Sequence, residues 1–401
     1  MLQYREPLDD IYQNFLCPPV GTKLSAKEAM SIAISKALEG VGYVETNPLV
    51  GAVAVDKNHC FIAAGAHLKN GSSHAEANLL KVIEEQNQVH LLRGATIYVT
   101  LEPCAHKGRT SSCAKTLASL PISKLVYGLV DPDPRVNGKG INIIEQAGIK
   151  VSPCSYKDPL LGRLIEVFSW VKTTSMPFVS MKAATTLNGV IARQGDQRCW
   201  ITGERARSYG HWLRLFYDAI LVGPKTIAFD NPRLDVRFLP QKHRVPWRVV
   251  YDPDAQALLS RDFKGHDLFK VSPEKLIWCC HHKVWRRLSK DIMFFLESLG
   301  VSCFSLLSFN HHENYLQILQ ELAKRGCASL LLEGGAFIWG SFLNFKLVNR
   351  AHLFQAPIIF GNGERVYWDS SLQISQLELK DLEWTPLDKD FLIEGRVTNS
   401  I

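Results

Sequence analysis

Hydrophobic positions recur along the chain with the periods of strands and helices, and the two patterns alternate. Short apolar runs predict strands, and the turn Lys57-Asn58-His59 between two of them predicts a hairpin. Ser25 and Glu28 have the spacing of a capping box, which marks a helix start. The predicted strands are 49–56, 61–66, 96–101 and 125–130, and the predicted helices are 25–40 and 75–85. This alternation predicts one α/β domain at 25–151, after an irregular N-terminal extension at 1–24.

The same alternation resumes after Pro177 and predicts a second α/β domain, residues 177–401, with a sheet of six or more strands. Prolines flank one amphipathic helix at 160–171, so we expect residues 152–176 to connect the domains. The predicted strands are 178–184, 218–223, 247–252, 275–280, 301–306, 328–332 and 351–359. The predicted helices are 203–216, 284–299, 313–325 and 336–345.

Composition narrows the class of protein. The 401 residues carry a net charge of +7, which is too weak and scattered to predict a nucleic-acid surface. The longest apolar runs fall far short of the ~20 residues of a membrane span, and the N-terminus shows no signal peptide. We therefore expect a cytoplasmic protein that acts on a small molecule, without membrane or nucleic-acid partners. A homo-oligomer is compatible with the sequence.

Ten cysteines are too few for a disulfide scaffold in a chain of this length. Most are expected to be ordinary buried thiols. The run Cys279-Cys280-His281-His282 has the residue types of a metal site. Neighbouring side chains on a strand point to opposite faces, however, so the run is interpreted as the end of a strand.

The strongest chemical signal combines His74-Ala75-Glu76 with Cys104, 28 residues after the glutamate, and Cys113. One imidazole and two thiolates suit tetrahedral zinc and leave one position open, as in catalytic sites. Zinc lowers the pKa of a bound water toward ~7, and Glu76 would then move protons between that water and the substrate. Eight residues separate the two cysteines, whereas the nucleic-acid deaminase signature has two.

The segment Leu101–Cys113 resembles the long zinc loop of the bifunctional riboflavin-biosynthesis deaminase/reductases of bacteria and plants. The motifs at 47–51, 65–67 and 131–134 match that family in order and spacing. The resemblance implies a cytidine-deaminase-like zinc domain followed by a dihydrofolate-reductase-like reductase domain. The first would deaminate 2,5-diamino-6-ribosylamino-4(3H)-pyrimidinone 5′-phosphate, and the second would use NADPH to reduce the ribosyl group to ribityl.

In the first domain, the resemblance makes His74, Cys104 and Cys113 the zinc ligands and Glu76 the catalytic residue. It implies that the pyrimidine and its sugar phosphate are bound by Asn47, His67, His106, Lys107, Arg109 and Asp131. The cationic side chains of the loop also suit a phosphate by their charge. Asp133 stands where the family often has Asn.

In the second domain no Gly-x-Gly-x-x-Gly follows a strand, which disfavours a conventional dinucleotide fold. An apolar strand instead meets Gly334-Gly335 before a helix, a turn that lets backbone N–H groups approach a phosphate. The resemblance implies that NADPH is bound by Ala184, Trp200, Thr226, Asp230, Gly335, Ala336, Phe337, Ile338, Trp339, Gly340 and Ser341. It implies that the ribosyl phosphate is bound by Lys182, Arg198, Arg214, Leu234, Arg237 and Glu333.

The second domain departs from the family at two places. Asn188 replaces a usual Asp, and the segment 195–200 is one residue longer than usual. A deaminase with an impaired reductase half is therefore an alternative, as is a non-enzymatic zinc-binding module. A deaminase acting on tRNA adenosine is a third, but it predicts a basic, aromatic-rich surface and the short cysteine spacing, and the sequence has neither.

Overall fold

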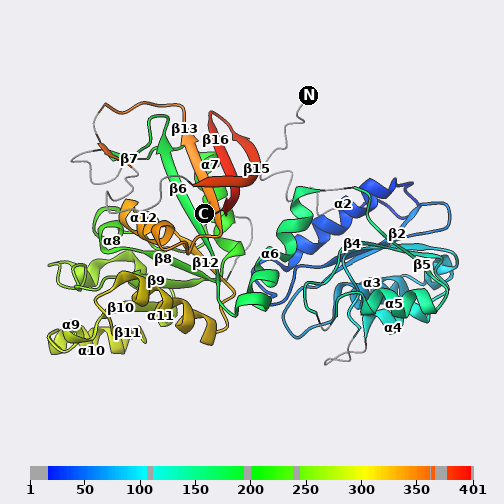
Figure 1. The fold of residues 1–401 in the computed structure, drawn as a ribbon, viewed down its shortest axis with the longest axis horizontal. Coiled ribbons are helices and arrows are strands. Elements are labelled where there is room, and N and C mark those ends of the chain that lie inside the picture. Colours follow the sequence, from blue (N-terminus) through cyan, green and yellow to red (C-terminus); the bar gives the residue numbers. More distant parts are fainter. Residues whose placement is uncertain are drawn as a thin grey trace. The chain divides into compact units, whose positions relative to one another are not determined.

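The computed structural model describes residues 17–105, 112–134, 136–156, 158–193, 200–237, 244–361, 363–365 and 377–398. The chain forms two compact units, one from Leu8 to Ser175 and the other from Met176 to Ile401 (Figure 1). No helix among the described residues is both long and apolar enough to cross a membrane.

The first unit is built on a five-stranded sheet with the order β2-β1-β3-β4-β5. Its strands are β1 (Gly51–Val55), β2 (Phe61–Ala66), β3 (Thr96–Leu101), β4 (Lys124–Leu129) and β5 (Lys150–Pro153). Strand β1 is antiparallel to both β2 and β3, whereas β3, β4 and β5 are parallel. The helices are α2 (Ala26–Ala37), α3 (Ala75–Glu85), α4 (Cys113–Ala118), α5 (Lys139–Gln146) and α6 (Pro159–Thr174).

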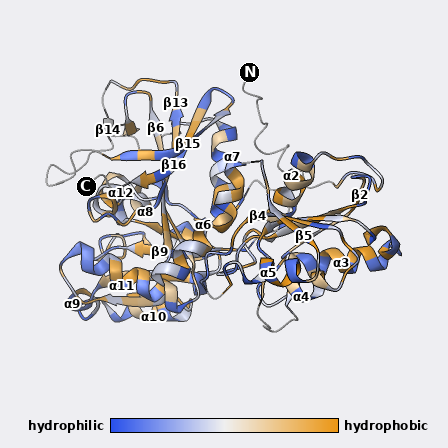
Figure 2. Cartoon of the chain, turned by 45° about the vertical axis from the view of Figure 1, so that its right-hand side comes forward, coloured by the Kyte–Doolittle hydropathy of each residue, from blue (hydrophilic) through white to orange (hydrophobic). Residues whose placement is uncertain are grey.

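Both faces of this sheet are buried, because alternate residues of β1 enter two separate cores. Ala52 and Ala54 pack with the side of the sheet that α3, α4 and α5 cover. Val53 and Val55 pack with α2 and α6 on the other side. Figure 2 shows hydrophobic residues along the strands of this sheet. The predicted hairpin and the Ser25–Glu28 capping box are both confirmed.

The segment 152–176, which we expected to act as a connector, is largely part of the first unit. Pro153 belongs to β5 and pairs with Tyr127 of β4. Leu161 and Leu164 of α6 are buried in the core beside α2. The amphipathic face of this helix therefore covers the sheet, and its prolines mark where the helix begins and where the next strand follows.

The second unit contains a nine-stranded sheet with the order β11-β10-β9-β8-β12-β6-β13-β16-β15, which confirms the predicted minimum of six. The strands from β11 to β13 are parallel, and β16 and β15 are antiparallel additions at one edge. They are β6 (Phe178–Thr186), β8 (Ala219–Val222), β9 (Trp247–Tyr251), β10 (Leu276–His281), β11 (Ser302–Leu306), β12 (Ser329–Leu332), β13 (Arg350–Ala356), β15 (Glu378–Leu387) and β16 (Asp390–Thr398). A separate ribbon pairs β7 (Val190–Arg193) with β14 (Gly363–Arg365).

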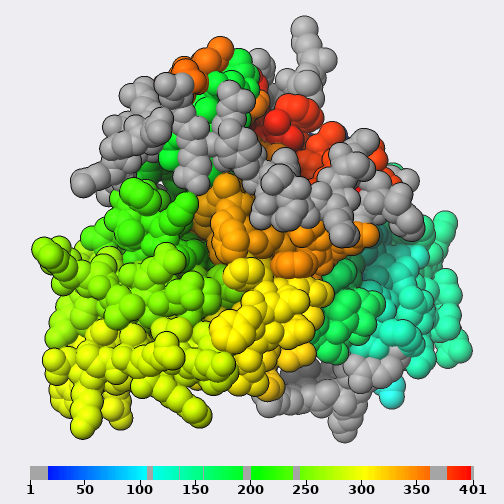
Figure 3. Space-filling model, turned by 60° about the vertical axis from the view of Figure 1, so that its left-hand side comes forward, coloured from blue at the N-terminus to red at the C-terminus, as the bar shows by residue number. Residues whose placement is uncertain are grey.

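The helices of this unit are α7 (Glu204–Leu213), α8 (Pro224–Asp230), α9 (His282–Trp285), α10 (Lys290–Ser298), α11 (His311–Lys324) and α12 (Ala336–Asn344). Helices α11 and α12 pack on one face of the sheet, and α10 packs on the other. The yellow and orange parts of the chain, which include α11 and α12, lie side by side on the surface in Figure 3.

Two sequence predictions need correction here. The helix expected at 284–299 is two helices, because Ser289 accepts a hydrogen bond from Ile292 N and starts α10 anew. Strands β15 and β16 were not predicted, because β16 buries Glu394 where the pattern requires an apolar residue. The interpretation of Cys279-Cys280 as strand residues is confirmed, since both lie buried in β10.

Candidate active sites: a metal centre and a large cavity

Two of the predicted metal ligands lie at the starts of helices, and the third lies just after a strand. His74 is the extended residue that precedes α3, Cys104 follows β3, and Cys113 is the first residue of α4. Ser112 fixes the last junction, because its hydroxyl donates to Cys104 O at 2.8 Å and accepts from Lys115 N at 3.3 Å. A cap residue thus ties the start of α4 to the backbone of the second ligand.

The ligand atoms have the spacing that zinc requires. His74 Nδ1 lies 3.6 Å from Cys104 Sγ and 3.4 Å from Cys113 Sγ. Ordinary zinc–sulfur and zinc–nitrogen bonds at tetrahedral angles place such atoms about 3.6 Å apart. Within the described ranges, this is the one group of three or more His, Cys, Asp or Glu residues that could hold a metal, and it contains no fourth member. The donor set fits a zinc site with one open position.

Burial and mutual hydrogen bonds set the electrostatics of the centre. The Cys113 thiol and then His74 hydrogen-bond the Cys104 sulfur and lower the pKa of Cys104, which favours its thiolate. The hydrogen bond to Cys104 and burial raise the pKa of Cys113. Glu76, in the first turn of α3, is 4% exposed, and burial raises the pKa of its carboxyl.

Asn47 and His67, two of the predicted substrate residues, contact each other at this centre. Asn47 Nδ2 lies 3.3 Å from His67 Nε2, and the His67 ring meets His74 edge-on at 5.5 Å between centroids. Burial lowers the pKa of His67, which favours the neutral ring. The structure therefore brings His67 beside a metal ligand and Asn47 beside His67.

Asp131, another predicted substrate residue, is buried at the start of a loop. Glu102, which the sequence analysis missed, holds this loop. Glu102 accepts hydrogen bonds from the backbone N–H groups of Asp131, Gly138 and Gly140 at 3.0–3.3 Å. Asp131 in turn accepts from the backbone N–H of Asp133 at 2.8 Å. The available sequence signal for Glu102 was its place in the matched motif, two residues before Cys104. His106, Lys107 and Arg109 lie outside the described residues.

A cavity of about 1160 Å³ opens in the second unit at the carboxyl ends of β8, β9 and β12. That volume exceeds the 300–1,000 Å³ typical of small-ligand sites, so it has room for a cofactor and a substrate together. Most of the residues predicted to bind either molecule line it: Lys182, Ala184, Trp200, Arg214, Thr226, Asp230, Leu234, Arg237, Glu333 and Gly335–Trp339. Gly340 and Ser341 do not line the cavity, and Arg198 lies outside the described residues.

Two of the predicted substrate residues form an ion pair with each other. Arg214 Nε and Nη2 donate to the two carboxylate oxygens of Glu333 at 2.5 and 2.9 Å, and Nη1 donates to Asp235 O at 2.7 Å. Burial acts against the Glu333 carboxylate, but the charge and hydrogen bonds of Arg214 lower its pKa to about 2. The guanidinium fork is therefore already engaged by protein carboxylate.

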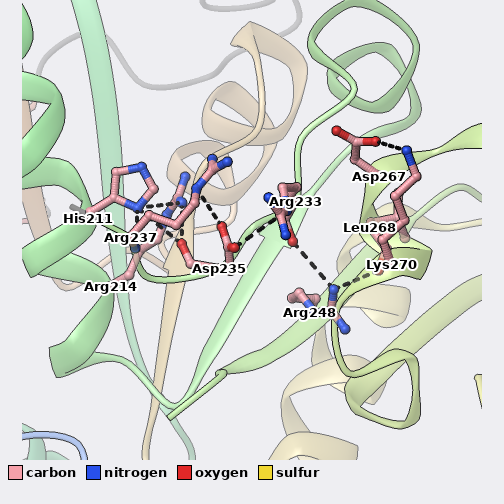
Figure 4. A network of polar contacts seen from close by, with 9 residues as sticks. All are labelled: His211, Arg214, Arg233, Asp235, Arg237, Arg248, Asp267, Leu268 and Lys270. Atoms are coloured by element: carbon pink, nitrogen blue, oxygen red, sulfur yellow. Dashed lines mark hydrogen bonds and ion pairs between the residues drawn. The ribbon is translucent and has the colours of Figure 1, made fainter. Parts of the chain in front are cut away.

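A wider polar network extends from Arg214 (Figure 4). Arg237 and Arg233 approach Asp235 from its two sides, at 2.8 and 3.6 Å, and His211 Nδ1 lies 3.1 Å from Asp235 O. Leu234, between Arg233 and Asp235 in the sequence, has φ 53°, a left-handed conformation that is rare for a leucine. Strained backbone of this kind gathers at functional sites.

Several cavity residues were missed by the sequence analysis. Lys182, which was predicted, is joined there by Arg207, His211, Lys225, Arg233, Tyr251 and His311. Arg207 lies over the Trp200 ring at 4.7 Å. Their only signal in the sequence was proximity to a strand end or a matched motif. Burial lowers the pKa of Lys182, whose ammonium lies 5.5 Å from the centre of the Phe354 ring.

Asn188, one of the two departures from the family pattern, lies away from the residues that line the cavity. Its Nδ2 donates to Phe360 O at 2.8 Å, and its Oδ1 accepts from Thr186 Oγ1 at 2.7 Å and from Phe360 N at 3.3 Å. The amide thus joins the end of β6 to the segment after β13.

Two family models match the chain, one on each unit. The cytidine and deoxycytidylate deaminase zinc-binding region matches residues 24–129, and the RibD C-terminal domain matches residues 177–393. The order agrees with the predicted zinc deaminase domain followed by a reductase domain, and it confirms that fold class.

Known proteins resemble the chain over most of its length. The riboflavin biosynthesis protein RibD of Bacillus amyloliquefaciens is 34% identical over 337 residues, 83% of this chain and 84% of that protein. RibD of Chlamydia trachomatis is 34% identical over 90% of this chain and 92% of its own length. Solved structures of Acinetobacter baumannii RibD and of a Thermotoga maritima diaminohydroxyphosphoribosylaminopyrimidine deaminase/5-amino-6-(5-phosphoribosylamino)uracil reductase each share 31% identity. They align with TM-scores of 0.74 and 0.75 over 93% of this chain and 99% of theirs.

Proposed function

The chain belongs to the RibD family of bifunctional riboflavin-biosynthesis enzymes, and on that premise we propose how its residues divide the two reactions. The enzyme is a zinc-dependent deaminase and an NADPH-dependent reductase. Its substrate is 2,5-diamino-6-ribosylamino-4(3H)-pyrimidinone 5′-phosphate. The first unit replaces an amine of the pyrimidine by oxygen, and the second reduces the ribosyl group to ribityl.

His74, Cys104 and Cys113 hold the zinc ion, which when bound supplies a Lewis acid that lowers the pKa of a water in the open position. Glu76 is the proton carrier, because it is a buried carboxylate two residues from a ligand and is not itself in the ligand group. It would take a proton from the water and pass it to the ring nitrogen, and then carry a second proton from the added hydroxyl to the departing amine. Water adds, ammonia leaves, and the ring carbon gains a carbonyl.

Asn47 and His67 bind the pyrimidine beside this centre, and the cationic side chains His106, Lys107 and Arg109 bind the sugar phosphate. The contact between Asn47 and His67 and the position of His67 against His74 support the first part. Asp131 faces the phosphate end of the same pocket. Glu102 keeps the loop of Asp131 in place through four hydrogen bonds that it accepts from backbone N–H groups.

NADPH, when bound in the cavity of the second unit, supplies a hydride. Gly335 precedes α12 without a side-chain cap, so the first N–H groups of that helix are available to a phosphate of the cofactor. A Cβ on Gly334 would lie 2.7 Å from Ile338, which explains the first glycine of the pair. Ala184, Trp200, Thr226, Asp230 and residues up to Trp339 line the remaining wall of the cofactor site.

Lys182 and Arg237 bind the ribosyl phosphate substrate, and the Arg214–Glu333 pair lines the same cavity. Glu333, held as a carboxylate by Arg214, offers acceptors to sugar hydroxyl groups. Lys182 lines the cavity and burial lowers its pKa, which suits an ammonium group that gives a proton to a sugar oxygen.

The convergence of His74, Cys104 and Cys113 beside Glu76 carries the deaminase assignment. Purified protein is incubated with the diaminopyrimidine phosphate, first without and then with NADPH, and the products are identified by mass. Without NADPH we expect the exchange of one NH for oxygen, and with NADPH the further gain of two hydrogens. Unchanged substrate in the first reaction would refute the deaminase assignment, and no gain of hydrogen in the second would refute the reductase assignment.

A further inference from the structure

We propose that Glu45 and Asn70 are positioning residues of the deaminase site. They orient the Asn47 amide so that its oxygen, and not its NH₂ group, faces the pyrimidine. The inference deepens the proposed function and rests on it, because it takes Asn47 as a ligand of the substrate. Neither Glu45 nor Asn70 lies in a motif that the sequence analysis singled out as chemical.

Four side chains, those of Glu45, Asn70, Asn47 and His67, form one hydrogen-bonded chain. Asn47 Nδ2 lies 3.2 Å from Asn70 Oδ1 and 3.3 Å from His67 Nε2, so both of its hydrogens have acceptors. Asn70 Nδ2 donates to the carboxylate of Glu45. Among the described residues, Asn47 Oδ1 has no such partner and is left for a ligand.

The groups at the two ends of this hydrogen-bonded chain determine which side chain donates and which accepts at each of its bonds. At one end the Glu45 carboxylate can only accept, so Asn70 turns its NH₂ toward Glu45 and its carbonyl oxygen toward Asn47. At the other end, Ser73 O is a carbonyl that His67 Nδ1 approaches to 3.0 Å, so Nδ1 donates and the neutral ring presents Nε2 as an acceptor. Asn47 therefore meets acceptors on two sides and keeps its NH₂ toward the protein.

That arrangement of donors and acceptors matches the substrate class. An aminopyrimidine carries N–H donors on its exocyclic amines and ring, and Asn47 Oδ1 can accept from them. The reverse orientation would present an NH₂ to those donors and lose the bond. Recognition of the substrate thus depends on two residues that need not touch it.

The backbone supports the same arrangement. Asn70 N donates to Tyr43 O at 3.0 Å, which ties the segment 43–47 to the segment 67–70. Glu45 has φ 52°, a left-handed conformation without a glycine, and in it the carboxylate reaches Asn70. Both side chains are exposed, so their influence on substrate binding is expected to be modest.

The test reverses the donors and acceptors of the hydrogen-bonded chain with one substitution and restores them with a second. Glu45→Lys places an ammonium, which only donates, opposite Asn70, and the asparagine turns its carbonyl toward the cation. We expect the KM of the full-length zinc enzyme for the diaminopyrimidine phosphate to rise roughly fivefold to tenfold, with a smaller change in kcat. Adding Asn70→Asp supplies a carboxylate that accepts from both neighbours, and it should return most of the lost KM.

Lys69→Ala, an exposed neighbour, is the matched control, and zinc content together with NADPH oxidation on the deaminated pyrimidine shows that both units remain intact. Asn70→Leu should raise KM, and Asn70→Asp alone should raise it less. An unchanged KM in both Glu45→Lys and Asn70→Leu would overturn the inference, as would a double variant no better than Glu45→Lys. If Asn47→Ala leaves the KM of an active deaminase unchanged, the proposed role of Asn47 fails, and this inference fails with it.

Discussion

The metal centre of the first unit and the cavity of the second hold their polar groups in opposite ways. At the metal centre three ligand atoms converge within 4.8 Å and have no cation of their own among them. In the cavity two arginines already have carboxylate partners in the protein, Arg214 with Glu333 and Arg237 with Asp235. The first site is completed by the ion that it binds, whereas in the second these two pairs are formed within the protein itself.

This difference determines how each site should respond to change. Removal of one ligand from a three-ligand centre leaves too few donors to hold zinc, so the whole reaction is lost. Removal of one partner from a buried ion pair leaves the other charge uncompensated, so folding is affected as well as binding. The metal centre should therefore show losses of activity, and the cavity should show losses of stability.

The largest effect is expected for Cys104→Ser. A hydroxyl is a poor zinc ligand, so the variant should lose its metal and all measurable deamination, while NADPH oxidation on the deaminated pyrimidine continues. Metal analysis and the two separate assays check this. Cys60→Ser, another partly buried cysteine of the first unit, should leave both reactions unchanged. Full zinc in Cys104→Ser would remove Cys104 from the ligand set.

Glu76→Gln separates the catalytic group from the ligands. The amide keeps the size of the side chain but cannot accept a proton from water, so deamination should fall by roughly 10²-fold or more. Zinc content should stay at the wild-type level, because Glu76 is outside the ligand group. Loss of zinc in this variant would show that the carboxylate coordinates the metal.

Arg214→Met tests the cavity. It leaves Glu333 buried without its cation, and removal of one partner of a buried pair costs about 3–5 kcal/mol in the free energy of unfolding. Reduction should fall while deamination continues. Denaturant unfolding and the two assays give the comparison, and Arg214→Met combined with Glu333→Gln should recover stability without recovering reduction. If Arg214→Met and the wild type are equally stable, the claim that the Arg214–Glu333 pair stabilises the fold is wrong.

The pH dependence of that variant follows from the pKa of Glu333. In the folded wild type the pKa of Glu333 is about 2, below the ordinary 4.5. The stability that the ion pair contributes is therefore complete above pH 4.5 and is lost as the pH falls toward 2. In Arg214→Met, burial without the cation raises the pKa of Glu333, and protonation relieves the penalty. The difference in unfolding free energy should therefore shrink as the pH is lowered from about 7 to about 4.

The same contrast explains what the sequence could predict. The group of His74, Cys104 and Cys113 could be predicted because zinc restricts its ligands to a few residue types, and these three lie at two helix starts and just after one strand. Helix α3 was predicted because its apolar positions share one face, and the β1–β2 hairpin was predicted because a polar turn separates two apolar runs. Local rules were sufficient there.

The cavity depends on contacts between distant parts of the chain. Arg214 and Glu333 lie 119 positions apart, and nothing in either neighbourhood indicates that they pair. Strand β16 was missed for a similar reason. Its Glu394 is buried because His352 Nδ1 lies 2.5 Å away, and the other nitrogen of that ring lies 2.8 Å from Tyr217 Oη. A pattern of apolar residues cannot show a polar position that another strand satisfies.

The smallest predicted effect concerns Asn188, where the resemblance alone suggested an impaired reductase. Asn188→Asp keeps the acceptor that Thr186 and Phe360 N use, but it loses the donor to Phe360 O and brings a carboxylate against that carbonyl. The loss of one such bond costs about 1 kcal/mol in the free energy of unfolding. Since protonation would restore a donor, the loss should shrink as the pH falls through the pKa of the new carboxyl.

Asn188 does not line the cavity, so the KM for NADPH and the rate of reduction should stay within about twofold of the wild type. Unfolding midpoints at two pH values and steady-state reduction measure both parts. A marked gain in reduction with Asn188→Asp would mean that the asparagine does impair the second unit, and that the balance of charges in the cavity extends to the end of β6.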